Sequence, residues 1–307
     1  MAKHPNEVRW PYLIANMYVS PKNWQKALEY FEKSNKVEET DMAWERIAAC
    51  HEEMGNYDEA LRSIERAIAL DSTDLLYKAS RADILYNTGQ VNAAIGAWDE
   101  ILEIQPEYAH GYYVRGWYKE LAGYADEAIE DETMAIVLNP DYAYAYVTRG
   151  NIYETQGKKE LAEADFKKVI ELEDTPDKYT CAHFAYQGLG QYEKAAAVMD
   201  SIIARDPTDA GSYYDAACLY SRMKNKEKAL FYLEKALELG YVRFAHMERD
   251  YDMDFLHETE EYKALTAKYK EKQARASVQN DRPQTSETNR ETVTTEVPFS
   301  KEAGVYK

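Results

Sequence analysis

Residues 109–142 read AHGYYVRGWYKELAGYADEAIEDETMAIVLNPDY, and residues 143–176 read AYAYVTRGNIYETQGKKELAEADFKKVIELEDTP. The second segment repeats the first with an offset of about 34 residues: Tyr112 matches Tyr146, Arg115-Gly116 matches Arg149-Gly150, Gly123 matches Gly157, and Ala128 matches Ala162. A period of this length is typical of paired helices that stack on their neighbours. The pattern therefore predicts an all-α array rather than a domain with one central core.

The same pattern extends over most of the chain. Related segments occupy residues 8–41, 41–74, 75–108, 176–209 and 210–241, so we expect about seven helix pairs within residues 1–241. A glycine recurs where the chain must reverse between two helices and a positive φ is favoured: Gly55, Gly89, Gly123, Gly157 and Gly190. An alanine recurs where two helices approach most closely and a larger side chain would overpack: Ala60, Ala94, Ala128, Ala162, Ala195 and Ala229.

These recurring small, aromatic, Gly and Pro positions resemble the tetratricopeptide repeat family over roughly residues 8–241. The resemblance implies a right-handed α-solenoid of antiparallel helix pairs. It also implies that the first helix of each pair lines a concave groove, which binds a peptide or an extended protein segment. Residues 242–275 resemble the closing segment of many bacterial repeat proteins. We expect capping helices there, ending in an amphipathic helix near residues 258–275 that covers the last pair.

The inward face of the first helices provides the candidate binding residues: Tyr86, His110, Tyr113, Trp117, Tyr144, Asn151, Phe184 and Tyr214. Aromatic side chains on a concave surface supply large contact area at low entropic cost. The alternative is that some of them pack between adjacent pairs. Family members that bind an acidic chaperone tail need Lys and Arg at inward positions, which here hold Ala79, Tyr113 and Val147. We therefore expect an acidic, aromatic groove to prefer a basic or apolar segment.

Charged residues also recur in phase with the repeat. Arg81, Arg115 and Arg149 could form a basic ladder that reads phosphate. The alternative is structural pairing, because Asp131 and Asp165 recur at a matching phase on the second helices.

One charged position is expected to be buried. Glu132 stands where the neighbouring segments have Trp98 and Phe166. A buried carboxylate needs a partner, and Arg149 in the next segment is the predicted one.

Composition excludes several classes of function. The net charge of -18 argues against non-specific binding to nucleic acid or to an anionic membrane surface. No apolar run approaches the ~20 residues that cross a bilayer. The first residues are a poor signal peptide, since Glu7 and Arg9 interrupt their only apolar stretch. The 3 separated cysteines fit free thiols, so we expect a cytoplasmic protein, or a periplasmic one if a signal peptide was removed.

No pattern indicates catalysis, a cofactor or a metal. The sequence contains neither a Walker-type phosphate loop nor a nucleophile elbow, and the histidines show no metal-ligand spacing. Asp250, Asp252, Asp254 and Glu261 match the ligand spacing of a calcium loop, but Phe255 replaces the glycine that such a loop needs. We therefore expect a protein that is not an enzyme.

The end of the chain changes character twice. Polar residues dominate 276–295 and predict a flexible linker. A period of two then begins, and residues 296–307 form a strand-like tail. It is either a loose terminus or the start of a further domain. The tail resembles the opening strand of retropepsin-like aspartic proteases, whose Asp-Thr-Gly or Asp-Ser-Gly motif is absent here. The function is thus either a non-catalytic scaffold or the recognition arm of a larger enzyme continuing beyond residue 307.

Overall fold

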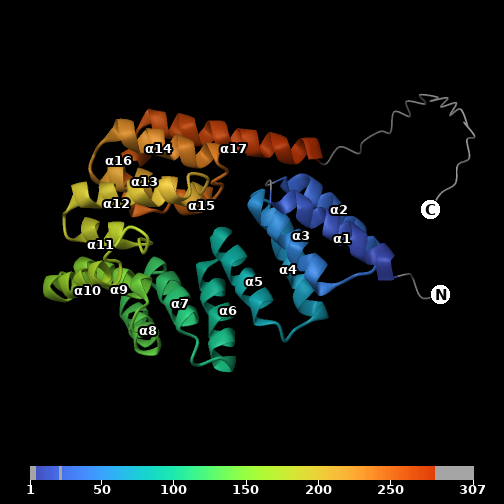
Figure 1. Ribbon diagram of the computed structural model, residues 1–307, viewed down its shortest axis with the longest axis horizontal. Helices are drawn as coiled ribbons and strands as arrows, with labels where there is room; N and C mark the ends of the chain where they lie inside the picture. Colours follow the sequence, from blue (N-terminus) through green and yellow to red (C-terminus); the bar gives the residue numbers. More distant parts are fainter. Residues whose placement is uncertain (1–4, 21–22, 281–307) are drawn as a thin grey trace, which may run out of the picture.

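The computed structural model describes residues 5–20 and 23–280. Seven consecutive helix pairs form a curved stack within these residues (Figure 1). The pairs are α1 (Pro5–Val19) with α2 (Trp24–Val37), α3 (Asp41–Glu53) with α4 (Tyr57–Leu70), α5 (Leu75–Asn87) with α6 (Val91–Ile104), α7 (Ala109–Leu121) with α8 (Ala125–Leu138), α9 (Ala143–Thr155) with α10 (Lys159–Leu172), α11 (Ala182–Gly188) with α12 (Tyr192–Arg205), and α13 (Ala210–Arg222) with α14 (Lys226–Glu238). The predicted all-α solenoid is confirmed, and the described part of the chain contains no strand.

Small residues set the geometry of each pair, as the repeat predicts. Ala94 and Ala128 are fully buried where their helices meet the first helix of the same pair. Gly123 joins α7 to α8 with φ +86°, a conformation that strains an L side chain. Lys224 takes the equivalent place between α13 and α14 and still adopts a φ of 55°. The turn is therefore kept even where the glycine is lost.

Large side chains on the second helices fill the spaces between pairs. Phe166 on α10 is 1% exposed and packs against glycines of α9 and α11. A Cβ at Gly150 would lie 2.8 Å from Phe166 Cε1, so this crossing requires a glycine.

Glu132 takes the place of such a side chain on α8, and it is fully buried as predicted. The predicted pair with Arg149 is wrong, because neither carboxylate oxygen of Glu132 has a hydrogen-bond partner. Arg149 is instead held by Asp165, to which its Nε and Nη2 donate at 2.9 and 2.8 Å. Burial raises the pKa of Glu132 well above its ordinary value.

The arginine ladder is a set of structural pairs. Arg115 donates to Asp131 through Nε at 2.8 Å and Nη2 at 2.6 Å. The structural pairing of these arginines with Asp131 and Asp165 is therefore confirmed for both aspartates. The corresponding contact of Arg81 is looser, with Nη2 3.4 Å from Glu100 Oε2.

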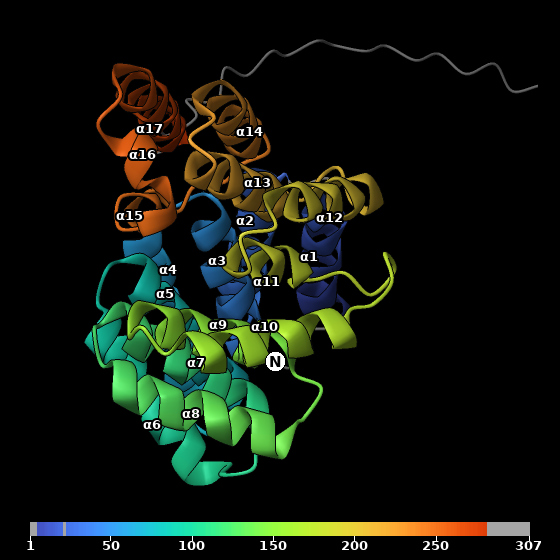
Figure 2. The same ribbon diagram turned by 90° about the vertical axis from the view of Figure 1, so that its left-hand side faces the viewer.

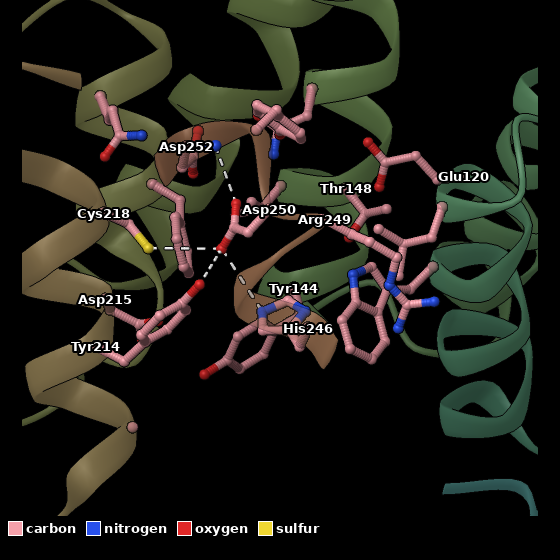
Figure 3. A pocket seen from close by; sticks show the side chains of 18 of the residues that line it. Glu120, Tyr144, Thr148, Tyr214, Asp215, Cys218, His246, Arg249, Asp250 and Asp252 are labelled. Carbon is pink, nitrogen blue, oxygen red and sulfur yellow. Dashed lines mark hydrogen bonds and ion pairs between the residues drawn. The ribbon is translucent and has the colours of Figure 1, made fainter. Parts of the chain in front are cut away.

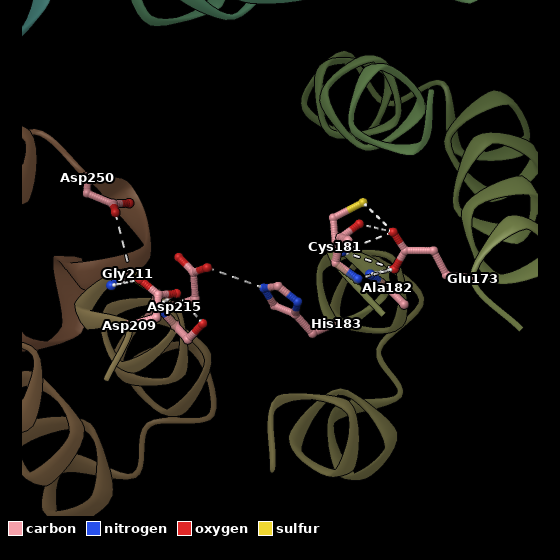
Figure 4. Close-up of polar contacts among 11 residues, drawn as sticks. Glu173, Cys181, Ala182, His183, Asp209, Gly211, Asp215 and Asp250 are labelled. Carbon is pink, nitrogen blue, oxygen red and sulfur yellow. Dashed lines mark hydrogen bonds and ion pairs between the residues drawn. The ribbon is translucent and has the colours of Figure 1, made fainter. Parts of the chain in front are cut away.

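The sixth pair departs from the repeat. Its first helix, α11, begins only at Ala182, and Tyr179 lies in the irregular segment before it rather than in a helix. Glu173 orders this segment by accepting hydrogen bonds from the backbone N–H groups of Thr180, Cys181 and Ala182, at 2.8, 3.0 and 2.8 Å (Figure 4). A carboxylate at a helix start satisfies donors that the helix itself cannot.

Four short or capping helices follow the array: α15 (Phe244–Met247), η1 (Tyr251–Met253), α16 (Asp254–His257) and α17 (Glu260–Asn280). Tyr262 and Tyr269 of α17 pack with Leu233 and Ala236 of α14, and thereby cover the last pair. The helix runs through residues 276–280, where the sequence predicts a linker. The rest of that linker and the strand-like tail, residues 296–307, lie outside the described residues.

The C-terminal helices also return to the beginning of the array. Figure 1 shows the far end of α17 beside α3, and Figure 2 shows α15 next to α4 and α5. Gln273 Nε2 donates to the carbonyl oxygen of Met54, at the turn after α3, over 2.9 Å. The helices after the last pair therefore also contact the second and third pairs of the array.

Candidate functional site

The concave side of the array holds a cavity of about 450 Å³. Its walls come from the first helices α5, α7, α9, α11 and α13 and from residues 241–252, which follow α14 (Figure 3). First helices line it because the second helices occupy the convex side of each pair. The cavity is thus built by five repeats and one non-repeat segment.

The structure brings together seven of the eight candidate residues. The cavity is lined by Tyr86, Tyr113, Trp117, Tyr144, Asn151, Phe184 and Tyr214. Their exposure differs: Tyr144 is 37% exposed, whereas Tyr86 and Tyr214 are each 3% exposed. Tyr86 and Tyr214 therefore belong to the floor of the cavity, and Tyr144 is available to a ligand.

His110 does not line the cavity. It lies at the start of α7, and its Nδ1 is 2.7 Å from Tyr142 Oη. Its ring stands edge-on to Trp98, with the ring centres 6.1 Å apart. The residue belongs to the packing between repeats, the alternative that the sequence leaves open.

Aromatic rings on the cavity wall contact one another in two separate pairs. The ring centres of Tyr86 and Trp117 are 5.0 Å apart, and those of Tyr113 and Tyr144 are 5.8 Å apart. Such contacts fix ring orientations in advance of binding, so a ligand loses little side-chain entropy on contact.

Sequence reasoning missed the contribution of residues 241–252, which were expected only to cap the last pair. His246 of α15 enters the concave side, with its ring centre 5.6 Å from that of Tyr214 and 6.5 Å from that of Trp117. Asp250 accepts a hydrogen bond from Tyr214 Oη over 2.8 Å. Asp252 accepts one from Arg222 Nη1 over 2.9 Å. The Asp-rich turn that resembles a calcium loop thus anchors the wall of the cavity.

Three further carboxyl groups line the cavity without a Lys or Arg partner within 4 Å among the described residues: Glu120 of α7, Glu154 of α9 and Asp215 of α13. Burial, together with Asp252, raises the pKa of Glu120 to about 7. Burial and the neighbouring Asp209, Asp250 and Asp252 raise the pKa of Asp215 to about 7. Glu120 and Asp215 can therefore change charge near neutral pH.

Within the described residues, no group of three or more His, Cys, Asp or Glu side chains is arranged to hold a metal ion. No helix in the same ranges combines the length and the apolar character that crossing a bilayer demands.

Family models identify the repeats directly. A model described as "Tetratricopeptide repeat" matches residues 42–74, and a second with the same description matches residues 143–176 and 210–239. The chain contains tetratricopeptide repeats. Proteins of this kind act generally as protein-interaction scaffolds, and no catalytic domain is identified in this one.

Curated relatives carry the same repeats. A TPR repeat-containing protein of Methanocaldococcus jannaschii is 23% identical over 232 residues, which is 72% of this chain and 41% of that protein. A TPR repeat-containing thioredoxin of Arabidopsis thaliana is 32% identical over 85 residues, or 28% of this chain and 22% of the relative. The chain thus spans less than half the length of these relatives. Neither they nor the family models support the resemblance of the tail to an aspartic protease.

Solved structures share the fold. A tetratricopeptide repeat protein from Parabacteroides merdae superposes with a TM-score of 0.58 at 17% identity, covering 81% of this chain and 98% of that one. MamA from Desulfovibrio magneticus gives a TM-score of 0.52 at 17% identity, covering 56% and 98%. At this identity the likeness concerns the architecture alone.

Proposed function

We propose that this tetratricopeptide repeat protein is a non-catalytic scaffold that binds an extended peptide segment in the concave cavity. One observation supports this most directly: five first helices and residues 241–252 direct aromatic side chains into a single cavity of about 450 Å³. A cavity of that size holds a few side chains and not a folded domain. The rest of an extended segment would lie along the concave surface, where polar groups such as Asn151 and Glu154 are available for backbone contacts.

The proposed compartment is the cytoplasm. Cys50, Cys181 and Cys218 are all buried free thiols, which suits a reducing environment. The net charge of -18 supports a protein or peptide partner rather than nucleic acid or a membrane.

The test starts from peptides selected by display against the full chain, whose dissociation constants are then measured. Replacing Trp117 and Tyr144 together with Ala removes two aromatic surfaces from the cavity wall. We expect affinity to fall at least about tenfold, because truncating a buried aromatic anchor commonly costs more than about 1.4 kcal/mol. Circular dichroism checks that the double variant is folded, because Trp117 also packs against Tyr86 and Tyr118. The single variant Tyr144→Ala should change the melting transition little, since Tyr144 is 37% exposed.

The matched control replaces two aromatic side chains that do not line the cavity, Tyr124→Ala with Phe231→Ala, which are 45% and 55% exposed. This control should bind as the wild type does. If the cavity variant keeps full affinity, or if the control loses as much, the proposed site is rejected.

A further inference from the structure

Asp215 is an acidic group that the fold leaves without a counter-ion. It lies on α13, lines the cavity and has 37% of its side chain exposed. Among the described residues, the only basic side chain within 4 Å of its carboxylate is His183, whose Nε2 is 3.8 Å from Oδ2 (Figure 4). This distance is too long for a hydrogen bond.

His183 does not neutralise Asp215. It is 1% exposed on α11, and neither of its ring nitrogens has a hydrogen-bond partner. Burial lowers the pKa of His183 to about 3, so the imidazole is neutral at ordinary pH. The imidazole of His183 therefore lies near the carboxylate of Asp215 without neutralising it, and the carboxylate can pair with a charged ligand.

The surroundings of Asp215 add negative charge rather than compensate it. Asp250 and Asp252 line the same part of the cavity, and only Asp252 has an arginine partner, Arg222. Asp250 is 3.6 Å from His246 Nε2. The nearby arginine Arg249 is held away from this cluster, since its guanidinium lies over Tyr86 at 5.7 Å and its Nε donates to the Ala245 carbonyl. In Figure 3, Asp215 and Arg249 lie on opposite sides of the cavity.

Two tyrosines line the cavity together with this carboxylate. They are Tyr144 and Tyr241, and the charge of Asp215 adds to the effect of burial in raising the pKa of both phenols. Tyr241 stacks on Tyr214 with ring centres 4.3 Å apart, which fixes its orientation. A cavity lined by both a carboxylate and aromatic rings attracts a cation through charge and through cation–π contact.

We propose that the Asp215 end of the cavity binds a positively charged amino group. Asp215, which the neutral His183 leaves uncompensated, is the counter-ion of this group. Tyr144 and Tyr241 supply aromatic rings in the same cavity. This inference rests on the proposed function and names the chemistry of its ligand: an extended segment presenting a lysine side chain. A free polyamine carries the same group, so the experiment separates these two sources.

The probes are two pools of acetylated, amidated random hexapeptides, one with a fixed central lysine and one with norleucine in its place. Retention of each pool on the immobilised full chain is measured by mass spectrometry, and spermidine binding is measured by calorimetry. We expect the wild type to retain the lysine pool about tenfold or more over the norleucine pool, the usual effect of a charge-assisted pair. Asp215→Asn should abolish this preference.

A matched control is needed because a chain of net charge -18 attracts any cation weakly. Glu160→Gln removes one exposed carboxylate on α10, which does not line the cavity. It should keep the preference for lysine. Circular dichroism verifies that Asp215→Asn is folded, and a second variant, Asp215→Glu, should restore part of the preference.

Each outcome decides between the readings. If spermidine binding depends on Asp215 and the lysine pool is not enriched, the cation site is supported and its ligand is a free polyamine. Equal retention of the two pools, with no spermidine heat, overturns the inference while leaving peptide binding in place. Retention of neither pool, with no spermidine heat, overturns both.

Discussion

The hydroxyl of Tyr86 lies 2.7 Å from Nδ1 of His246, a residue 160 positions further along the chain. Tyr86 belongs to the third helix pair, and His246 belongs to the short helix after the seventh. In an open solenoid each repeat contacts only its neighbours. Here the segment after the last repeat reaches back to α5 and completes the wall of the cavity.

Tyr86→Phe removes this contact without changing the ring. We expect the free energy of unfolding to fall by about 1 kcal/mol, the usual net value of one hydrogen bond. Amide hydrogen exchange in residues 241–257 should become faster, because the segment loses an anchor. Tyr118→Phe is the matched control: it removes a 2.7 Å hydrogen bond to Asp83 within the array and should leave exchange in 241–257 unchanged. Equal exchange in both variants would show that the Tyr86 contact does not hold the segment.

Glu132→Met should stabilise the protein. The carboxyl group is fully buried with both oxygens unpartnered, and an unsatisfied buried polar group costs about 1–3 kcal/mol. We expect urea unfolding at pH 7.5 to show a gain of that order. Glu130→Met, at an exposed position on the same helix, should change stability by about 0.5 kcal/mol or less. A loss of stability on Glu132→Met would mean that the carboxyl group has a role in the folded state that the hydrogen bonds do not reveal.

The arginines at one repeat phase should differ in importance. Arg149→Met leaves Asp165, whose side chain is 8% exposed, without its bidentate partner. Removing one partner of a buried pair costs about 3–5 kcal/mol. Arg81→Met should cost only about 0–1 kcal/mol, because Glu100 is 57% exposed and 3.4 Å away. Similar losses in urea unfolding for the two variants would contradict this distinction.

Stability should depend on pH through Asp215. Its pKa in the folded state is about 7, above the ordinary 3.8, so the folded state binds the proton more strongly than the unfolded state does. The contribution of this group to stability therefore increases as pH falls from about 8 to about 4. The titratable and charged groups that face it are His183, Tyr144, Tyr241, Cys218 and the carboxylates Asp209, Asp250 and Asp252.

Thermal melting of wild type and Asp215→Asn across pH 4–8 checks this. The variant should be more stable than the wild type at pH 8, and the difference should shrink toward pH 4. Glu120 has a pKa of about 7 as well, so Asp215→Asn should keep part of the pH dependence of the wild type. A constant difference across the range would mean that Asp215 ionises normally.

Features written into the repeat could be predicted from the sequence. Phase alone placed Gly123 in a turn, Ala128 at a helix contact and Arg149 opposite Asp165, because each is a local consequence of a helix pair. The same phase placed seven of the eight candidates around one cavity. His110 shares a helix face with Tyr113, but it lies at the start of α7, where its ring contacts Tyr108 and Tyr142 instead of the cavity.

Features outside the repeat could not be predicted in this way. The Tyr86–His246 and Met54–Gln273 contacts join residues that share no pattern, so no spacing indicates them. The predicted pairing of Glu132 with Arg149 is wrong for another reason. The phase of the repeat gives the position of a residue but not the direction in which a neighbouring side chain points. The late start of α11 depends on the capping of its first turn by Glu173, which a repeat alignment does not show.

The hydrogen bond from Gln273 to the Met54 carbonyl joins residues 219 positions apart, and this affects how the protein unfolds. An open stack can lose its outermost repeat while the interior stays intact, so its ends fray in small steps. Here α17 is attached to the second helix pair as well as to the last one, so its release also uncovers the turn after α3. Unfolding will therefore be more cooperative than repeat number alone suggests. The contact between Gln273 and Met54 must itself form late in folding, after nearly the whole chain has been ordered.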